Sequence, residues 1–207
     1  MKKLSILAAT LLASTVGFSQ ISVDPEVGVN FSNLRSKVGD EDPNTADSKA
    51  GLRAGIGLNI DLTEGLYIRP GVYYNMLGAK DETLGIESAT TLHYLEIPVN
   101  LGYRYALSEN AGNLFIEAGP YLAFALAGNV KADVLGVEVK DDINFGTESS
   151  ETNPIDWGFK FGLGYETPWG VFIKGNYGLG MGNLSNVDDV KLTNTAWNVS
   201  LGYRIHI

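Results

Sequence analysis

The feature that most constrains this chain is the alternation of apolar and polar residues over eight segments, with no charge at any of the apolar positions. Successive side chains of a β-strand point to opposite faces, so the alternation predicts strands with one apolar and one polar face. In residues 92–107, Leu95 and Val99 share one face, whereas Glu96 and Arg104 share the other. The eight segments are 26–33, 51–62, 66–77, 92–105, 114–127, 155–167, 171–182 and 195–207. Each has 8 to 14 residues, and a tilted strand needs about 9–11 residues to cross a bilayer.

The connections between these segments alternate between short and long. Short links follow the second, fourth and sixth segments, at 63–65, 106–113 and 168–170. Longer polar links follow the first, third, fifth and seventh segments, at 34–50, 78–91, 128–154 and 183–194. Bacterial outer-membrane barrels combine short periplasmic turns with longer external loops in this way. Within the third long link, residues 130–141 alternate again, which predicts a small hairpin outside the membrane.

The polar faces predict a closed lumen that is filled with paired charges. They carry six acidic and six basic residues among many glycines, and a narrow barrel interior must mix small residues with large ones. A buried charge that loses its partner costs about 3–5 kcal/mol, so charges inside the barrel must be paired. We therefore expect the apolar faces to rest on lipid. The predicted lumen network consists of Arg53, Arg69, Glu96, Arg104, Glu117, Asp156, Lys160, Glu166, Lys174 and Arg204, together with Glu26 and Asp61.

A soluble barrel of the lipocalin type, with its apolar faces turned inward around a ligand, stays open as the alternative architecture. The alternating link lengths argue against it, and so do three related motifs at 101–104, 163–166 and 201–204, which read LGYR, LGYE and LGYR. Each motif precedes a short link or the chain end, so the three tyrosines are expected at one membrane interface. The predicted aromatic girdle consists of Tyr103, Trp157, Tyr165, Trp197 and Tyr203.

Three prolines lie inside predicted strands, at Pro70, Pro98 and Pro120. Proline has no N–H to donate to a neighbouring strand, and a closed barrel has no free edge. We expect local bulges or missing ladder bonds at these positions.

The N-terminus predicts export. Lys2 and Lys3 precede an apolar run over 4–16 and the small residues Gly17 and Ser19, which is the arrangement of a secretory signal peptide. Cleavage after Ser19 would leave residues 20–207 as one barrel domain with both termini in the periplasm. It would also change the formal charge from −9 to −11, so electrostatics gives no reason to bind nucleic acid. The chain has no cysteine, which excludes disulfides and cysteine-based zinc sites.

The negative charge is concentrated in the four long links, which hold seven basic and fifteen acidic residues. Residues 40–44 have the first three ligand spacings of a calcium loop. However, Thr45 and Gly51 stand where that loop needs a glycine and a bidentate glutamate. Weak binding of divalent cations by the acidic loops is the remaining alternative to a solvated acidic surface, because hard cations take oxygen ligands.

Candidate catalytic groups do not form a recognisable set. Small barrels can modify outer-leaflet lipids, and His93 lies near the outer end of the fourth segment with Ser88 nearby. A hydrolase needs a base, a nucleophile and an orienting group within hydrogen-bond reach, and nothing in the sequence selects such a set. The glycine runs at 162–164 and 178–182 lack the following helix of a dinucleotide site. We predict no catalytic, metal or cofactor-binding residue and no enzyme activity.

Four stretches carry a family resemblance: YLEIPVNLGYR (94–104), FIEAGPYLAFAL (115–126), DWGFKFGLGYE (156–166) and NVSLGYRI (198–205). They resemble the PorT-like barrels of Gram-negative bacteria, which are often labelled porin family proteins. The resemblance implies an all-β fold, an eight-stranded antiparallel up-and-down transmembrane β-barrel of the outer membrane. Some relatives are linked to protein secretion and gliding. The chain departs from the pattern at Ile207, because such barrels usually end in an aromatic residue.

These observations favour a structural or interaction scaffold. It would sit among outer-membrane lipid and lipopolysaccharide, present acidic external loops and dock an envelope or secretion protein. A narrow channel for small solutes is the second hypothesis, although an eight-stranded interior is just filled by side chains and aqueous porins need about 16 strands. An outer-leaflet lipid-modifying enzyme that uses His93 is the third.

Overall fold

The computed structural model describes residues 21–39, 44–83, 86–108, 110–134 and 137–207. The predicted signal peptide, residues 1–19, lies outside the described residues, as do residues 40–43 of the acidic stretch. Among the described residues, no helix has the length and hydropathy that a membrane-spanning helix needs.

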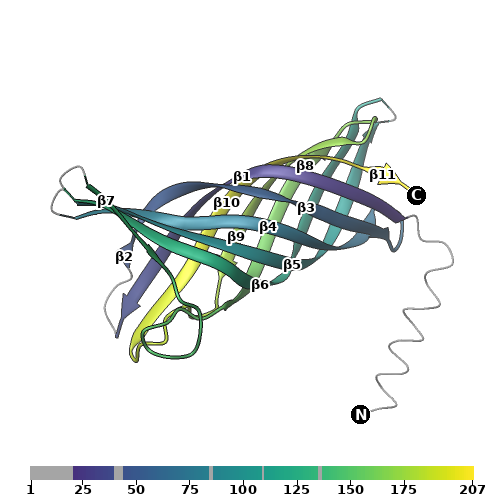
Figure 1. Cartoon of the computed structure of the whole chain (residues 1–207). Coiled ribbons are helices and arrows are strands. Elements are labelled where there is room, and N and C mark those ends of the chain that lie inside the picture. The colour runs from purple at the N-terminus through teal and green to yellow at the C-terminus, as the bar shows by residue number, and fades with distance from the viewer. Residues whose placement is uncertain (1–20, 40–43, 84–85, 109, 135–136) are drawn as a thin grey trace, which may run out of the picture.

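The described chain is almost entirely antiparallel β-structure (Figure 1). The strands are β1 (Ile21–Val38), β2 (Asn44–Thr45), β3 (Asp47–Asp61), β4 (Leu66–Thr83), β5 (Ile86–Ser108), β6 (Gly112–Val134), β7 (Val137–Asp142), β8 (Ile155–Glu166), β9 (Val171–Gly180), β10 (Val190–Tyr203) and β11 (Ile205–His206). Eight of them form a ring in the order β1-β3-β4-β5-β6-β8-β9-β10. Pairing of β10 with β1, from Glu26 opposite Gly202 to Val38 opposite Val190, closes the ring. The predicted eight-stranded up-and-down barrel is therefore confirmed.

The two ends of the barrel differ in the length of their connections. Residue 207 and the start of β1 lie at the end with the short turns (Figure 1), where Ser22 pairs with His206. Two of these turns contain Gly65 and Gly170 at φ values of 80° and 86°, which glycine adopts at little cost. Short turns mark the periplasmic end of an outer-membrane barrel, so the long connections are external.

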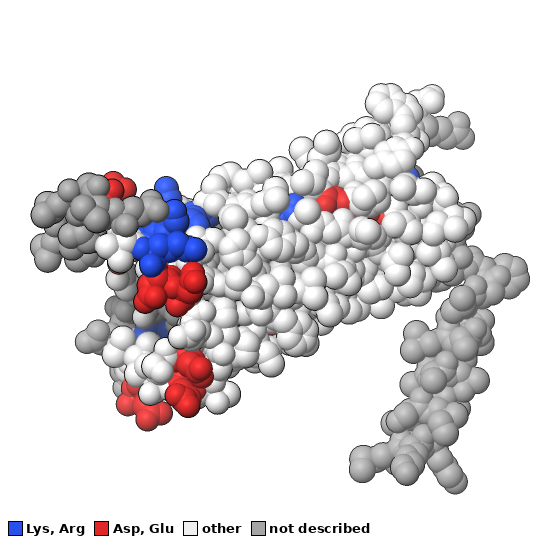
Figure 2. Space-filling model, in the orientation of Figure 1, with Lys and Arg blue, Asp and Glu red and all other residues white. Residues whose placement is uncertain are grey.

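Side-chain alternation gives the barrel an apolar outer wall and a polar interior. On β5, Ile97, Val99 and Leu101 are 40–54% exposed, whereas Glu96 and Asn100 on the opposite face are buried. Figure 2 shows the result as an almost uncharged wall, with Lys, Arg, Asp and Glu side chains gathered at the external end. An apolar surface of this extent is stable in hydrocarbon and not in water.

The strands are longer at the external end than the alternation predicts. Residues 78–91, predicted to be a polar loop, are mostly the continuing hairpin of β4 and β5, and most of 34–50 is likewise strand. Beyond the lipid a strand has no apolar face to maintain, so the alternation ends while backbone pairing continues. The predicted hairpin at 130–141 is confirmed, because β6 pairs with β7 from Asn129 opposite Asp142 to Val134 opposite Val137.

The three strand prolines interrupt pairing without shifting the register. The β4–β5 pairing stops after Pro70 opposite Val99 and resumes at Tyr73 opposite Glu96. The gap spans Pro98, and a gap between β5 and β6 likewise spans Pro120. The expected interruption of the backbone ladder at the prolines is therefore confirmed. The register shifts occur elsewhere, including one between His93 and Tyr94.

Candidate functional site

The lumen holds one continuous network of ion pairs. Every link joins a nitrogen and an oxygen no more than 3.5 Å apart, and six acidic side chains balance six basic ones. The acidic members are Asp24, Glu26, Asp61, Glu96, Glu117 and Glu166. The basic members are Arg53, Arg69, Arg104, Lys160, Lys174 and Arg204. The network is neutral, which is the condition under which charges are tolerated away from water.

Glu26 of β1 is the centre of this network. Its carboxylate lies 2.9 Å from Lys174 Nζ, 3.3 Å from Arg69 Nη2 and 3.5 Å from Arg53 Nε. Ser200 Oγ also donates to it at 2.7 Å. One buried carboxylate thus connects β1 with β3, β4, β9 and β10 across the barrel.

Two arms extend from this centre toward the barrel ends. Toward the outside, Glu96 accepts hydrogen bonds from Arg53 Nη1 at 3.0 Å and from Lys160 Nζ at 2.6 Å. Toward the periplasm, Asp24 lies 3.2 Å from Arg69 Nη2 and 2.9 Å from Arg204 Nη2. The periplasmic arm continues through Glu166 and Arg104 to Asp61. The network therefore runs along most of the lumen.

Asp156 differs from the other predicted network residues. It is buried, but its hydrogen-bond donors are neutral: Asn194 Nδ2 at 3.1 Å and Tyr121 OH at 3.4 Å. In the described part of the chain no ion pair reaches it. Asp24 completes the six acids instead. Asp24 was not among the predicted residues, because the apolar and polar alternation predicted a first strand that begins at Glu26. The strand begins at Ile21, and Asp24, two positions before Glu26, lies on the same face.

A small cavity lies beside the outer arm, and Glu96 and Lys160 of that arm line it. The cavity, of about 20 Å³, lies among Asn30, Asn75, Glu96 and Asp156, which is room for about one water molecule. This is far too small for a solute path.

An apolar cluster closes the outer end of the lumen. Leu92, Tyr94, Tyr121 and Ala123 are buried together, and Ile143 and Phe145 from the segment after β7 pack against them. The connection between β9 and β10 fixes that segment, because Asn186 Nδ2 donates hydrogen bonds to the carbonyl oxygens of Gly146 at 2.9 Å and Glu151 at 3.1 Å. The loops therefore cover the mouth of the barrel.

Aromatic rings fill the periplasmic part. Phe115 and Phe172 meet edge to face with their centroids 6.1 Å apart. The guanidinium of Arg69 lies 5.0 Å from the Phe172 ring, and that of Arg104 lies 5.2 Å from the Tyr67 ring. Cation–π contacts of this kind add to the ion pairs of the same arginines.

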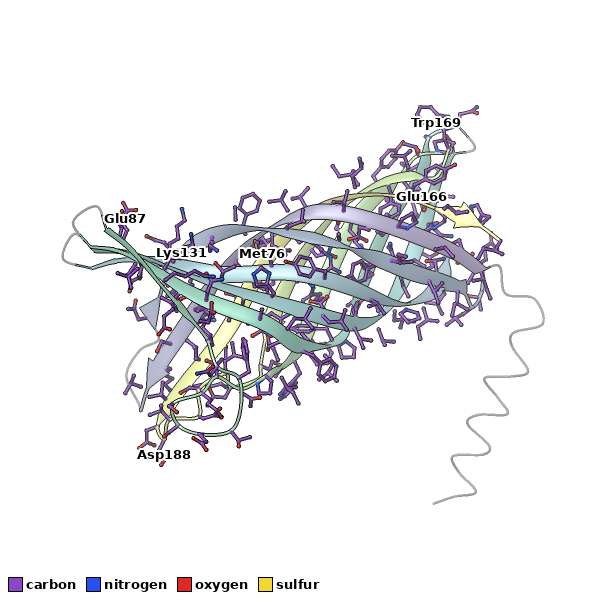
Figure 3. The ribbon with its side chains drawn as sticks, in the orientation of Figure 1. Met76, Glu87, Lys131, Glu166, Trp169 and Asp188 are labelled. Carbon is purple, nitrogen blue, oxygen red and sulfur yellow. The ribbon has the colours of Figure 1, made fainter. Side chains whose placement is uncertain are left out.

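The structure places the predicted girdle residues at different heights. Tyr103, Tyr165 and Tyr203 lie near the periplasmic ends of their strands, opposite Leu66, Ile173 and Val171 respectively. Trp157 lies near the external end of β8, whereas Trp197 lies at the middle of β10. Trp169, in a periplasmic turn and 76% exposed, was not among the predicted residues (Figure 3).

The predicted catalytic candidates do not converge. Ser88 and His93 lie five residues apart on β5, which is about 17 Å of strand. Ser88 Oγ donates to the backbone oxygen of Asp81 at 3.3 Å, whereas His93 Nδ1 and Tyr74 OH are 2.6 Å apart. Within the described ranges, no group of three or more Asp, Glu or His side chains is arranged to hold a metal ion.

A family model that matches most of the chain agrees with this architecture. Residues 14–186 match the family described as "Outer membrane protein beta-barrel domain". The structure is similar to Ail of Yersinia pestis, solved with the heparin analogue sucrose octasulfate, at 16% identity and a TM-score of 0.41 over 90% of this chain and 99% of Ail. It is also similar to Neisserial surface protein A, at 14% identity and a TM-score of 0.45 over 90% of this chain and 97% of that one. No curated protein matches the chain.

Proposed function

The chain belongs to the outer membrane protein beta-barrel domain family, and from that premise we propose that it is a closed, rigid scaffold. It lies in the outer membrane and presents its external loops to a protein partner of the envelope. The resemblance of its strand motifs to PorT-like barrels makes a component of protein secretion the partner that we would seek first.

The filled lumen is the observation that carries this proposal. Twelve charged side chains join the strands from within, from Lys160 in the outer arm to Asp61 at the periplasmic end. Because a broken pair in this environment costs about 3–5 kcal/mol, the network resists deformation of the wall. A wall that does not deform holds the external loops in fixed positions.

The external loops include a surface on which a partner could dock. β4, β5 and β6 continue past the barrel, and β7 adds one more strand whose second edge has no paired strand among the described residues (Figure 1). The residues there are mainly polar, with Asp141 and Asp142 exposed. An open, polar sheet edge is a suitable place for a second protein to add a strand.

The two alternative functions have less support. Passage of a solute needs a continuous path, and the cavity of about 20 Å³ beside Glu96 has room for about one water molecule. Hydrolysis of a lipid needs a nucleophile beside His93. The side chain that forms a hydrogen bond with His93 is Tyr74, through its hydroxyl group. An assay of lipopolysaccharide deacylation by the native protein and by His93→Ala tests the latter; activity lost only in the variant would overturn our preference.

Crosslinking in intact cells tests the scaffold proposal. We would replace residues 130–141 with a two-residue turn and, as a control, Trp169 with alanine at the opposite end of the barrel. The hairpin variant should fold, as judged by its heat-modifiable mobility in gels, and should lose the crosslinked partner, whereas Trp169→Ala should keep it. If the partner is retained without the hairpin, this surface is not the interface; if the native chain captures none, the scaffold proposal fails.

A further inference from the structure

The strand β7 is the last strand of the sheet that projects beyond the apolar wall. It pairs with β6 over Val137–Asp142, and among the described residues no strand pairs with its other edge (Figure 1). Residues 139 to 142 are all exposed, and Val139 is 55% exposed. The edge is therefore accessible to a second molecule over these four residues.

The register of the hairpin determines which backbone groups of β7 face the open edge. The N–H of Ile143 donates to a carbonyl oxygen of β6 at 2.9 Å. Along an antiparallel ladder, hydrogen-bonded pairs alternate with pairs that are not hydrogen-bonded. The N–H and C=O groups of Asp141 and Val139 therefore point toward β6. Those of Lys140 and Asp142 point toward the open edge, where unpaired peptide groups can bind another strand.

The projecting sheet is acidic. Seven acidic residues and three lysines, a formal net charge of −4, lie in its four segments, 78–83, 86–91, 128–134 and 137–142. On β7, Lys140 is already paired, because its Nζ lies 3.4 Å from Asp142 Oδ1. Asp141 is exposed, and no described basic side chain forms an ion pair with it. A strand added at this edge therefore gains most from basic side chains.

Asp141 and Val139 determine which side chains fit opposite β7. Their backbone groups point toward β6, so both would take non-hydrogen-bonded positions opposite an added strand. At such positions the Cα atoms of facing residues are about 4.5 Å apart and the side chains are in closest contact. A basic group complements Asp141, and an aliphatic one complements Val139. Lysine offers both, because its charged end is carried on an aliphatic stem.

We propose that the open edge of β7 binds an extended, basic peptide segment of the protein partner as an added strand. The proposal rests on the scaffold function proposed above and specifies the kind of segment that the partner presents. Main-chain hydrogen bonds to Lys140 and Asp142 would supply affinity, and the acidic surroundings would select a basic segment. A second copy of this chain is disfavoured as the occupant, because it would bring two sheets of net charge −4 together.

Amide hydrogen exchange of the native barrel tests the proposal directly. The full-length barrel is placed in phosphatidylcholine nanodiscs, and the probe is an octapeptide in which threonine and lysine alternate. An octapeptide of alternating threonine and glutamate is the control. Saturating lysine peptide should slow exchange of the Lys140 and Asp142 amides, followed by NMR, more than that of Val139 and Asp141, whose N–H groups already point toward β6. Unchanged exchange at Lys140 and Asp142, or equal binding of the glutamate peptide, would overturn the proposal.

Two variants of equal charge separate backbone pairing from electrostatic attraction. Lys140→Pro removes the N–H at the open edge and no donor of the β6–β7 ladder. Lys140→Gln removes the same charge and keeps the N–H. The affinity of each variant for the lysine peptide, labelled with fluorescein, is measured by fluorescence anisotropy.

The Gln variant should bind at least as tightly as the native chain, because it has lost a positive charge. The Pro variant should bind at least about tenfold more weakly than the Gln variant, since one backbone hydrogen bond is lost and the proline ring obstructs the added strand. Equal affinities of the two variants would contradict strand addition. If Lys140→Pro does not fold, the exchange measurement on the native chain decides.

These outcomes are separate from those of the crosslinking test. A partner captured in cells, with no protection of the Lys140 and Asp142 amides by the peptide, would keep the scaffold and reject strand addition at this edge. Peptide binding with no captured partner would keep the edge site and reject the scaffold.

Discussion

Lys174 Nζ lies 2.9 Å from Glu26 Oε2 across the lumen, although β9 and β1 are not neighbours in the sheet. The backbone ladders connect each strand only to its two neighbours. Ion pairs through the interior add connections between strands that the ladders do not join. The barrel is therefore stabilised both around its circumference and across it.

Removal of the Glu26 charge should be strongly destabilising. Glu26→Gln leaves Lys174, Arg53 and Arg69 with an incomplete set of partners in a buried site. The free energy of unfolding should fall by about 3–5 kcal/mol, measured by urea titration of the barrel in lipid vesicles. The double variant Glu26→Gln/Lys174→Met is the control. Because it removes a charge of each sign, it should lose less than the sum of the two single variants, and strict additivity would contradict the coupling.

Two lumen glycines should respond in opposite ways to alanine. A Cβ added at Gly119 would lie 2.0 Å from the backbone oxygen of Val99, whereas at Gly178 the nearest atom would be Lys160 Cε at 3.4 Å. Gly119→Ala should therefore lose about 1–3 kcal/mol through overpacking. Gly178→Ala should be neutral or slightly stabilising, since alanine loses less conformational freedom in a strand. Thermal unfolding of both variants in the same detergent checks this; equal melting temperatures would show that the interior is looser than described.

A charge on the outer wall should cost most at the middle of the membrane. Val99 pairs with Pro70 near the centre of the apolar band, and Leu107 lies eight residues farther toward the periplasm on the same strand. Val99→Arg should reduce the free energy of folding into vesicles by about 2–4 kcal/mol, and Leu107→Arg by no more than about 1 kcal/mol. The same cost at both positions would mean that Val99 does not face hydrocarbon.

The fold could be predicted because one physical rule governs every membrane-crossing segment. Lipid on one side and a polar lumen on the other impose alternation, and Ile97, Val99 and Leu101 obey it without exception. The rule fails where lipid ends. The continuation of β4 to Thr83 and of β5 back to Ile86 carries no alternation to detect, so that hairpin was predicted as a loop.

The lumen could be predicted in composition and only partly in pairing. The alternation of side chains along each strand is enough to place Arg53, Glu96 and Lys160 on the inward face, and the structure brings them together. The alternation cannot tell which inward-facing acidic side chain forms an ion pair with a basic one, because that depends on which strands face each other across the barrel. For this reason Asp156 was expected in the network, whereas its donors are Asn194 and Tyr121. The packing of Phe145 over the mouth of the barrel could not be predicted either, because the sequence pattern of a loop does not show which residues the loop contacts.

The conductance of the purified barrel in planar bilayers is the most direct test of the closed lumen. The native chain should give no reproducible single-channel steps. A variant in which residues 143–154 are replaced by a short turn should also stay silent, because the ion pairs of Glu96 and Glu26 lie below the covering segment. Regular steps of constant size from the native chain would show an open path through the barrel and would contradict the account.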